Sequence, residues 1–173
     1  MILRELGLVT AYRMHAPKWA TAPMSGAGAA AYGGRANRPG TPALYLALEP
    51  ATAIGVYRQL SPLMPPGTLV SYTVRLTPIV DFIAGYDRTH WSELWEEFYC
   101  HWREIWFNEH VEPPSWVLAD DAIAAGAKGI LFASRLVAGG RNLVVYNEML
   151  QAADLLEVCD PGGALPRNQD SWR

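Results

Sequence analysis

The chain has 173 residues and a formal net charge of −3 at pH 7, from 14 lysines and arginines against 17 aspartates and glutamates. This length corresponds to one domain. Half of the residues are hydrophobic and only 18% are charged, which excludes a wholly disordered chain. The weak negative charge argues against direct binding of nucleic acid, which needs a strongly basic face. Twelve of the basic residues are arginines, the residue suited to forked recognition of phosphate.

The sequence carries no signal for a membrane or an oxidising compartment. Residues 1–13 lack the apolar core and cleavage site of a signal peptide, and no run of about 18 apolar residues occurs. Cys100 and Cys159 are too few for a disulfide framework and lack the spacing of metal ligands. We therefore expect a cytoplasmic protein without a membrane partner.

The first half of the chain alternates strand patterns with one helix pattern. Pro50 suits the first turn of that helix, where its missing N–H costs nothing. The predicted elements are, in chain order, a strand over residues 1–14, a loop over 15–42, a strand over 43–48, a helix over 50–60 with Ala53, Val56 and Leu60 on one face, and strands over 68–76 and 79–83.

The second half begins with the clearest helix pattern, over residues 89–108. Five aromatic residues recur there at spacings of three or four, which favours packing in a core over a stacking platform for bases: Trp91, Trp95, Phe98, Trp102 and Trp106. A helix over 116–125 and strands over 129–133 and 143–146 follow. The mixture lacks strict βαβ alternation, so it predicts an α+β fold with a mixed β core and flanking helices.

Two further patterns weigh against other kinds of site. His90 and His101 lie about three helical turns apart, so they cannot share a metal ion, and we expect no metal. Residues 26–31 match a loose GxGxx(G/A) pattern, but no strand directly precedes them. We therefore do not interpret them as a dinucleotide-binding fingerprint.

The most informative segment is the glycine- and arginine-rich stretch over residues 32–40. Arg35 follows Gly33 and Gly34, so backbone and guanidinium can approach a phosphate together. Tyr45 stands at the start of a buried strand, where packing in the core is the default explanation for a tyrosine. Ser134 stands at a strand end, a place that suits both a functional hydroxyl and an ordinary turn.

Together these segments resemble the RES domain, the toxin of RES–Xre toxin–antitoxin pairs, from about residue 10 to 147. The resemblance is carried by Arg13, by SGAGAAAYGGRANRPGTPALYLALEPATA over 25–53, by PPSWVLADDAIAAGAKGILFASR over 113–135 and by GGRNLVVYN over 139–147. It implies a single ADP-ribosyltransferase-like domain, over residues 1–160, and leaves a mobile tail over 161–173. It also implies an activity that consumes NAD⁺ as substrate.

The resemblance further implies a catalytic set of an Arg, a Tyr, a Glu and a Ser. Arg35, Tyr45 and Ser134 match three of these, and we expect them to bind NAD⁺. The fourth position, eleven residues after Tyr45, is Val56 in place of the Glu. Glu49 is the nearest upstream carboxylate, but it precedes Pro50, where a helix cap belongs.

The implied function is cleavage of the nicotinamide–ribose bond of NAD⁺ with ADP-ribosyl transfer to a host protein. One alternative is a glycohydrolase or phosphorylase that depletes NAD⁺. Another is a RES module that binds NAD⁺ or an antitoxin with little turnover, because Val56 cannot act as a carboxylate. The implied partner is an Xre-like antitoxin that covers the cleft, and we expect Arg13, Arg38, Arg135 and Arg141 to flank it. A structural domain whose glycine-rich loop only crosses the surface is the remaining alternative.

Overall fold

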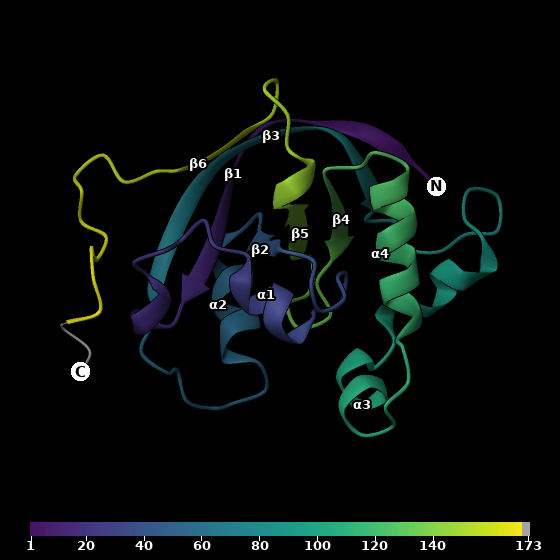
Figure 1. Ribbon diagram of the computed structural model, residues 1–173, viewed down its shortest axis with the longest axis horizontal. Helices are drawn as coiled ribbons and strands as arrows, with labels where there is room; N and C mark the ends of the chain where they lie inside the picture. The colour runs from purple at the N-terminus through teal and green to yellow at the C-terminus, as the bar shows by residue number, and fades with distance from the viewer. Residues whose placement is uncertain (171–173) are drawn as a thin grey trace.

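The computed structural model describes residues 1–170, which form one mixed sheet with helices packed around it (Figure 1). The strands are β1 (Leu3–His15), β2 (Ala43–Ala47), β3 (Thr68–Phe82), β4 (Gly129–Ala133), β5 (Arg141–Tyr146) and β6 (Leu155–Val158). The α-helices are α1 (Ala27–Tyr32), α2 (Pro50–Arg58), α3 (Trp102–Phe107) and α4 (Pro114–Ala124). Three 3-10 helices complete the fold: η1 (Pro17–Trp19), η2 (Glu93–Tyr99) and η3 (Asn147–Met149). The α+β class with a mixed β core is confirmed.

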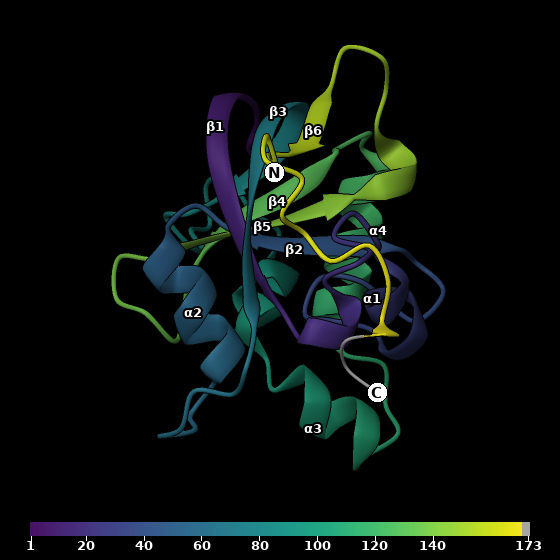
Figure 2. The same ribbon diagram turned by 90° about the vertical axis from the view of Figure 1, so that its left-hand side faces the viewer.

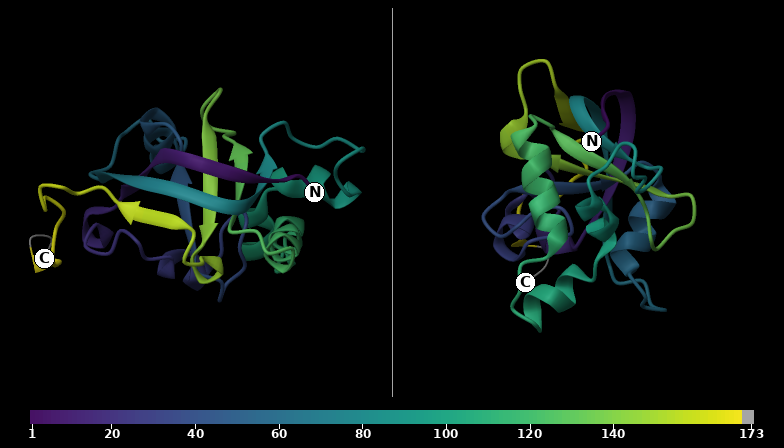
Figure 3. Two further views of the ribbon diagram at one scale, coloured as in Figure 1. Left: turned by 90° about the horizontal axis from the view of Figure 1, so that it is seen from above. Right: turned by 90° about the vertical axis from the view of Figure 1, so that its right-hand side faces the viewer.

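The sheet closes on itself through its two longest strands. Its strand order is β1-β2-β5-β4-β3-β6, and β1 also pairs with β3 along most of its length. Both strands arch over the shorter β4 and β5 and cross them steeply in the view from above (Figures 1 and 3). Among the strand pairs within residues 1–170, only β3 and β4 run parallel. Strands β1 and β2 share a single pairing, Tyr12 with Ala47, and the cavity described below lies beside it.

The two faces of the sheet bury different cores. One face, which holds Leu44, Tyr72 and Leu143, packs inside the ring of strands. The other face, which holds Val144 and Phe132, packs against α4 and the aromatic residues of η2. Because β4 and β5 are covered on both sides, their sequences are almost continuously apolar.

The predicted helix over residues 89–108 is wrong. The segment folds as η2 and α3, separated at Cys100 and His101, which have non-helical backbone angles. The break lets the aromatic residues pack on two different elements. Trp91, Trp95 and Phe98 surround Phe82 of β3, whereas Trp102 and Trp106 pack on Trp116 of α4. The packing role predicted for the aromatic stripe agrees with the burial of Trp91, Trp95, Phe98 and Trp102.

Other boundaries also differ from the sequence-based prediction. The segments over 68–76 and 79–83 are one strand, β3, because β1 pairs along both of them. The predicted loop over 15–42 contains η1 and the alanine-rich α1. Helix α2 ends at Arg58, which leaves Leu60 89% exposed and not on a buried face. The positions of α1 and α2 beside the sheet are clear from the side (Figure 2).

Residues 159–170 follow β6 in turns and bends. Leu165 packs against the core inside the ring of strands, and the Gln169 side chain donates to the carbonyl of Lys18 at 2.9 Å. The mobility predicted for residues 161–173 stays a prediction, and 171–173 lie outside the described residues. Within residues 1–170, every helix falls short of the length and hydropathy that a bilayer-spanning helix needs.

Candidate functional site

The arginine loop over residues 33–38 is braced by the phenol of Tyr45 from β2. The Tyr45 hydroxyl donates to Oδ1 of Asn37 at 2.8 Å and accepts from the backbone N–H of Ala36 at 2.9 Å. The N–H of Gly34 closes the loop on the carbonyl of Asn37 at 2.9 Å. A Cβ at Gly34 would lie 2.3 Å from the Tyr45 hydroxyl oxygen, so only glycine allows this close packing.

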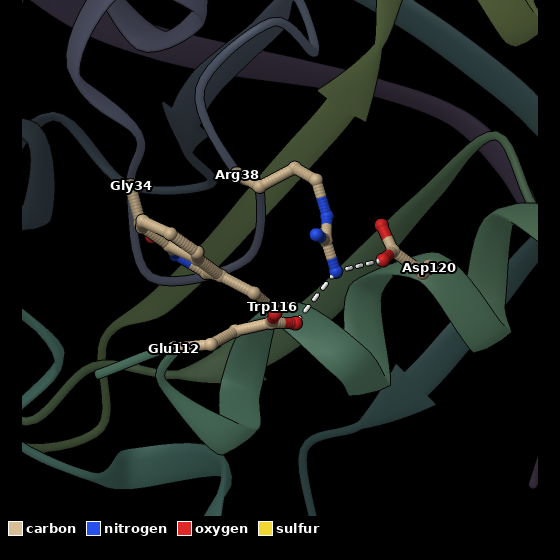
Figure 4. A network of polar contacts seen from close by, with 5 residues as sticks. All are labelled: Gly34, Arg38, Glu112, Trp116 and Asp120. Carbon is tan, nitrogen blue, oxygen red and sulfur yellow. Dashed lines mark hydrogen bonds and ion pairs between the residues drawn. The ribbon is translucent and has the colours of Figure 1, made fainter. Parts of the chain in front are cut away.

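Helix α4 holds the opposite side of the same loop (Figure 4). The indole Nε1 of Trp116 donates to the carbonyl of Gly34 at 2.6 Å. Arg38 reaches across to Asp120 of the same helix and, at 2.7 Å, to Glu112, which lies two residues before the helix begins. Arg38 is thus engaged by carboxylates outside the cavity. Arg38 belongs to the loop beside the cavity but does not line it, and its charge is compensated.

Arg35 points from the loop to the break between η2 and α3. Its Nη1 donates to the carbonyls of Phe98 and Cys100 at 3.0 and 3.1 Å. Its guanidinium carbon lies 5.5 Å from the ring centroid of Tyr99, within the range of a cation–π interaction. Burial lowers the pKa of Arg35 from its usual value, and no carboxylate within residues 1–170 compensates for that burial.

Tyr99 joins the arginine loop to the end of β4. The guanidinium carbon of Arg135 lies 5.0 Å from the Tyr99 ring centroid, so the ring contacts two arginines. Its hydroxyl donates to the carbonyl of Ala133 at 3.1 Å. Burial raises the pKa of Tyr99, so its phenol stays protonated at neutral pH.

Ser134 follows β4 directly and shapes the turn after it. Its Oγ accepts from the backbone N–H groups of Leu136 and Val137 at 3.3 and 3.2 Å. Its own N–H donates to the carbonyl of Gly140 at 2.7 Å. The hydroxyl proton is not used in these bonds, so Ser134 can still donate to a ligand.

Glu49 is committed to a structural ion pair. Its Oε1 accepts from Nε of Arg141 at 2.7 Å, and its Oε2 accepts from Thr52 and from the Arg141 backbone. Burial alone would raise the pKa of Glu49, but these bonds outweigh burial and lower it. Neither Glu49 nor Arg141 lines the cavity. The adjacent Asn142 does line it, so Arg141 lies next to the cavity with its charge compensated by Glu49.

The predicted residues meet at one cavity of about 470 Å³. Arg35, Tyr45, Val56 and Ser134 all line it, although they come from a loop, a strand, a helix and a strand end. Among residues 1–170, its lining contains no aspartate or glutamate but four arginines: Arg13, Arg35, Arg103 and Arg135. The cavity is therefore a strongly cationic site. Within the same range, no cluster of three or more metal-binding side chains occurs.

A comparison with known families matches the RES domain over residues 10–168. The chain belongs to the RES domain family. Its fold is also similar to a chain in the crystal structure of the M. tuberculosis MbcT–MbcA toxin–antitoxin complex, with a TM-score of 0.56 and 20% sequence identity. That likeness covers 88% of this chain and 82% of the other. A search of curated protein sequences returns no match.

The RES domain cavity includes two residues that sequence reasoning missed. Tyr99 directly follows Phe98 but does not belong to the aromatic stripe, so its spacing did not predict a functional role. Arg103 follows Trp102, with its guanidinium carbon 4.7 Å from that ring centroid. Tyr99 is the last residue of η2 and Arg103 the second residue of α3, so they line the cavity from either side of the break. The flanking role predicted for Arg13 and Arg135 agrees with their place in the lining, although Arg13 lies within β1 rather than in a loop.

Proposed function

We propose that this RES domain is the toxin of a toxin–antitoxin pair and that its cavity binds NAD⁺. In the proposed reaction the nicotinamide–ribose bond breaks and the ADP-ribosyl group passes to a cellular protein. The observation that carries the proposal is the cavity itself, which has four arginines, no lining carboxylate among residues 1–170 and about 470 Å³ of space. The volume suits a small organic ligand, and the arginines suit its pyrophosphate.

The cavity offers each part of NAD⁺ a chemically suitable partner. The guanidinium groups of Arg35 and Arg135 both contact the ring of Tyr99. This contact fixes them in orientations that can face a pyrophosphate. The rings of Tyr45 and Tyr99 can contact the planar nicotinamide. The free hydroxyl proton of Ser134 can bond the nicotinamide amide or the ribose.

The bond cleavage places a specific demand on the site. As the bond between ribose C1′ and the pyridinium nitrogen breaks, its electron pair leaves with nicotinamide and positive charge develops on the ribose. The acceptor then bonds to C1′ and loses its proton. A nearby carboxylate would stabilise that charge, as in glycoside hydrolysis. Val56 lines the cavity where the family resemblance implies this carboxylate, and valine cannot do so.

A second candidate function follows from the same observation. A cationic cavity without a carboxylate in its described lining binds anions well but stabilises an oxocarbenium ion poorly. A RES module that holds NAD⁺ or an antitoxin with little turnover fits these facts. The two candidates share the ligand and differ in the rate of nicotinamide release.

Substitution of Val56 separates the two candidates. We expect Val56→Glu to raise nicotinamide release from NAD⁺ by about 10²-fold, because it restores one electrostatic group beside the developing charge. Val56→Gln introduces a side chain shaped like glutamate but without its charge, so it should not raise nicotinamide release. Ile54 lies on the same helix and is 38% exposed. Ile54→Glu adds the same charge there and should leave the rate of nicotinamide release unchanged.

The outcome also distinguishes transfer from hydrolysis. Radiolabelled NAD⁺ incubated with the Val56→Glu protein and a cell lysate should place label on a protein band. Nicotinamide release with label only in free ADP-ribose products would favour a glycohydrolase or phosphorylase. Equal release by the unaltered and Val56→Glu proteins would show that Val56 does not occupy the position of the missing acid.

A further inference from the structure

The side chains that line the cavity limit the kind of group that can accept ADP-ribose there. Among residues 1–170, the lining contains no aspartate, glutamate, histidine, lysine or cysteine. The phenols of Tyr45 and Tyr99 stay protonated at neutral pH, because burial raises their pKa values. The Oγ of Ser134 already accepts two backbone N–H bonds. The described lining therefore offers an acceptor no general base at neutral pH.

This property matters because most acceptors have to lose a proton. Water, a serine hydroxyl and a lysine ammonium each carry a proton on the atom that bonds to ribose C1′. Transfer to any of them releases one proton, and a general base normally takes that proton as the bond forms. A carboxylate is different, since it is ionised at neutral pH and has no proton on its nucleophilic oxygen.

A carboxylate acceptor would also supply the negative charge that the described lining lacks. Positive charge develops on the ribose as the bond to nicotinamide breaks. Retaining glycosidases meet such a charge with a carboxylate, which then bonds to the same carbon. Val56 lines this cavity and cannot act in that way. A carboxylate that arrives with the acceptor could do both, stabilising the developing charge and forming the new bond.

Arg103 is the lining arginine best placed to receive a group that enters from solvent. It is exposed, whereas Arg35 is half-buried, and no carboxylate within residues 1–170 forms an ion pair with it. Its guanidinium carbon lies 4.7 Å from the ring centroid of Trp102, a contact that limits its orientations. Its charge acts electrostatically on Arg35 and Tyr45, so it lies near the groups proposed to hold NAD⁺. Arg135 is exposed too, but the proposed function already assigns it to the pyrophosphate.

We propose that the acceptor of the ADP-ribosyl group is a side-chain carboxylate, an aspartate or glutamate of another protein, and that Arg103 binds it. This proposal rests on the proposed transfer from NAD⁺. The carboxylate oxygen bonds to ribose C1′, the bond from C1′ to the pyridinium nitrogen breaks, and its electron pair leaves with neutral nicotinamide. The product is an ester of ADP-ribose. The step releases no proton, whereas hydrolysis of NAD⁺ releases one for each nicotinamide.

The experiment incubates the full chain with radiolabelled NAD⁺ and one of four short peptides, in phosphate-free buffer at neutral pH. The peptides have blocked ends and differ only at a central glutamate, glutamine, serine or lysine. We expect the glutamate peptide to take up about tenfold more label than the others. Neutral hydroxylamine should release this label, because it cleaves an ester at C1′ and leaves bonds to serine oxygen or lysine nitrogen intact. Transfer to this peptide should also release no proton.

Two sets of variants test the residues that the proposal uses. Arg103→Met should raise the KM for the glutamate peptide about tenfold, leave kcat unchanged and leave NAD⁺ affinity within about threefold. Arg103→Lys should restore part of the loss, and Arg88→Met, at an exposed arginine outside the cavity, should change nothing. Val56→Glu adds a carboxylate that can take up a proton, so the serine peptide should gain label relative to the glutamate peptide. Ile54→Glu should leave this ratio unchanged.

The possible results separate the acceptor from the proposed function. Label that resists hydroxylamine on the serine or lysine peptide would overturn the carboxylate acceptor. Nicotinamide release with one proton for each turnover and label on no peptide would show hydrolysis and would overturn it as well. An unchanged KM in Arg103→Met would remove Arg103 from the proposal. No nicotinamide release from either the unaltered or the Val56→Glu protein would contradict the proposed function itself, and the acceptor with it.

Discussion

At the scale of single residues, the site depends on a phenol that acts as a brace. Tyr45 was predicted as a residue that binds NAD⁺, and it does line the cavity. Its hydroxyl, however, is occupied by Ala36 and Asn37. It therefore holds the arginine loop in shape, and its ring remains the part that can contact a ligand. Burial raises the pKa of Tyr45 far above its usual range, so the phenol keeps the proton it donates to Asn37.

The packing at Gly34 makes this brace testable. We expect Gly34→Ala to reduce the free energy of unfolding by about 1–3 kcal/mol, because the new methyl group overlaps the Tyr45 hydroxyl and Oδ1 of Asn37. NAD⁺ binding should weaken as the loop shifts. Gly28→Ala is the matched control, since its Cβ meets nothing within 4 Å and α1 should gain about 0.5–1 kcal/mol. Denaturant unfolding measures the stability of both variants. An unchanged free energy of unfolding for Gly34→Ala would show that the loop can shift to accommodate the methyl group.

At the scale of elements, the break between η2 and α3 creates the site. A continuous helix would carry its stripe along one face, whereas two helices let Phe98 pack on the sheet while Trp102 packs on α4. The carbonyls of Phe98 and Cys100 at the break are the ones that Arg35 binds. The same irregularity that lets the aromatic residues pack on two different elements therefore positions the arginine.

Tyr99 connects η2 to the end of β4, and the contributions of its hydroxyl and of its ring can be measured separately. Tyr99→Phe removes only the bond to Ala133, so we expect a loss of about 0.5–1.5 kcal/mol in the free energy of unfolding. Tyr99→Leu also removes the ring between Arg35 and Arg135 and should weaken NAD⁺ binding further. Tyr32→Phe is the control, because Tyr32 is 69% exposed. Equal stability of Tyr99→Phe and the unaltered protein would show that this bond contributes nothing.

At the scale of the whole molecule, the closure of β1 on β3 ties the cavity to the global fold. His15, at the end of β1, donates from Nε2 to the Tyr72 hydroxyl of β3 at 2.7 Å, and Tyr72 donates to the carbonyl of Pro23 at 2.9 Å. The ring of strands and the loop that leads to α1 are thus joined by one buried chain of hydrogen bonds. Burial, aided by the charge of Arg13, lowers the pKa of His15 to about 4.

This histidine predicts how stability depends on pH. The unfolded chain takes up a proton at His15 below about pH 6.5, whereas the folded protein does so only near the lowered pKa of about 4. Stability should therefore fall as the pH falls through this window, by about 1–2 kcal/mol between pH 7 and pH 5. His15→Gln should remove that part of the pH dependence. His101 is exposed, so the control variant His101→Gln should retain it. Urea unfolding at several pH values gives the stability of each protein as a function of pH. The same pH dependence for the unaltered protein and both variants would contradict the assignment of this effect to His15.

The proposed antitoxin also belongs to this scale. A toxin that consumes a common metabolite has to be held inactive, and an acidic segment that covers the four arginines would do so directly. We expect an Xre-like protein encoded by the adjacent reading frame to bind this chain and to prevent NAD⁺ binding. Arg35→Ala should abolish NAD⁺ binding but only weaken this complex, since a protein interface spreads its contacts over about 800 Å² per partner. Unchanged NAD⁺ affinity in the saturated complex, measured by calorimetry, would exclude inhibition by occlusion.

The sequence by itself determined the elements whose signals are local. Local strand patterns predicted β1, β2, β4 and β5, Pro50 predicted the start of α2, and the aromatic spacing predicted a buried stripe. The segment around Arg35 indicated the family, and the family model that matches residues 10–168 confirms it. These features are readable because each depends on neighbours within a few turns or strand positions.

Only the tertiary structure decided which charges meet the cavity. Arg38 and Arg141 resemble Arg13 and Arg135 in the sequence, yet the first two pair with carboxylates and the latter two do not. Tyr99 and Arg103 line the cavity from either side of the break between η2 and α3, where the chain turns to pack Phe98 on the sheet and Trp102 on α4. An ion pair between residues 92 positions apart, such as Glu49 with Arg141, depends on how the strands close, and no local pattern encodes that closure.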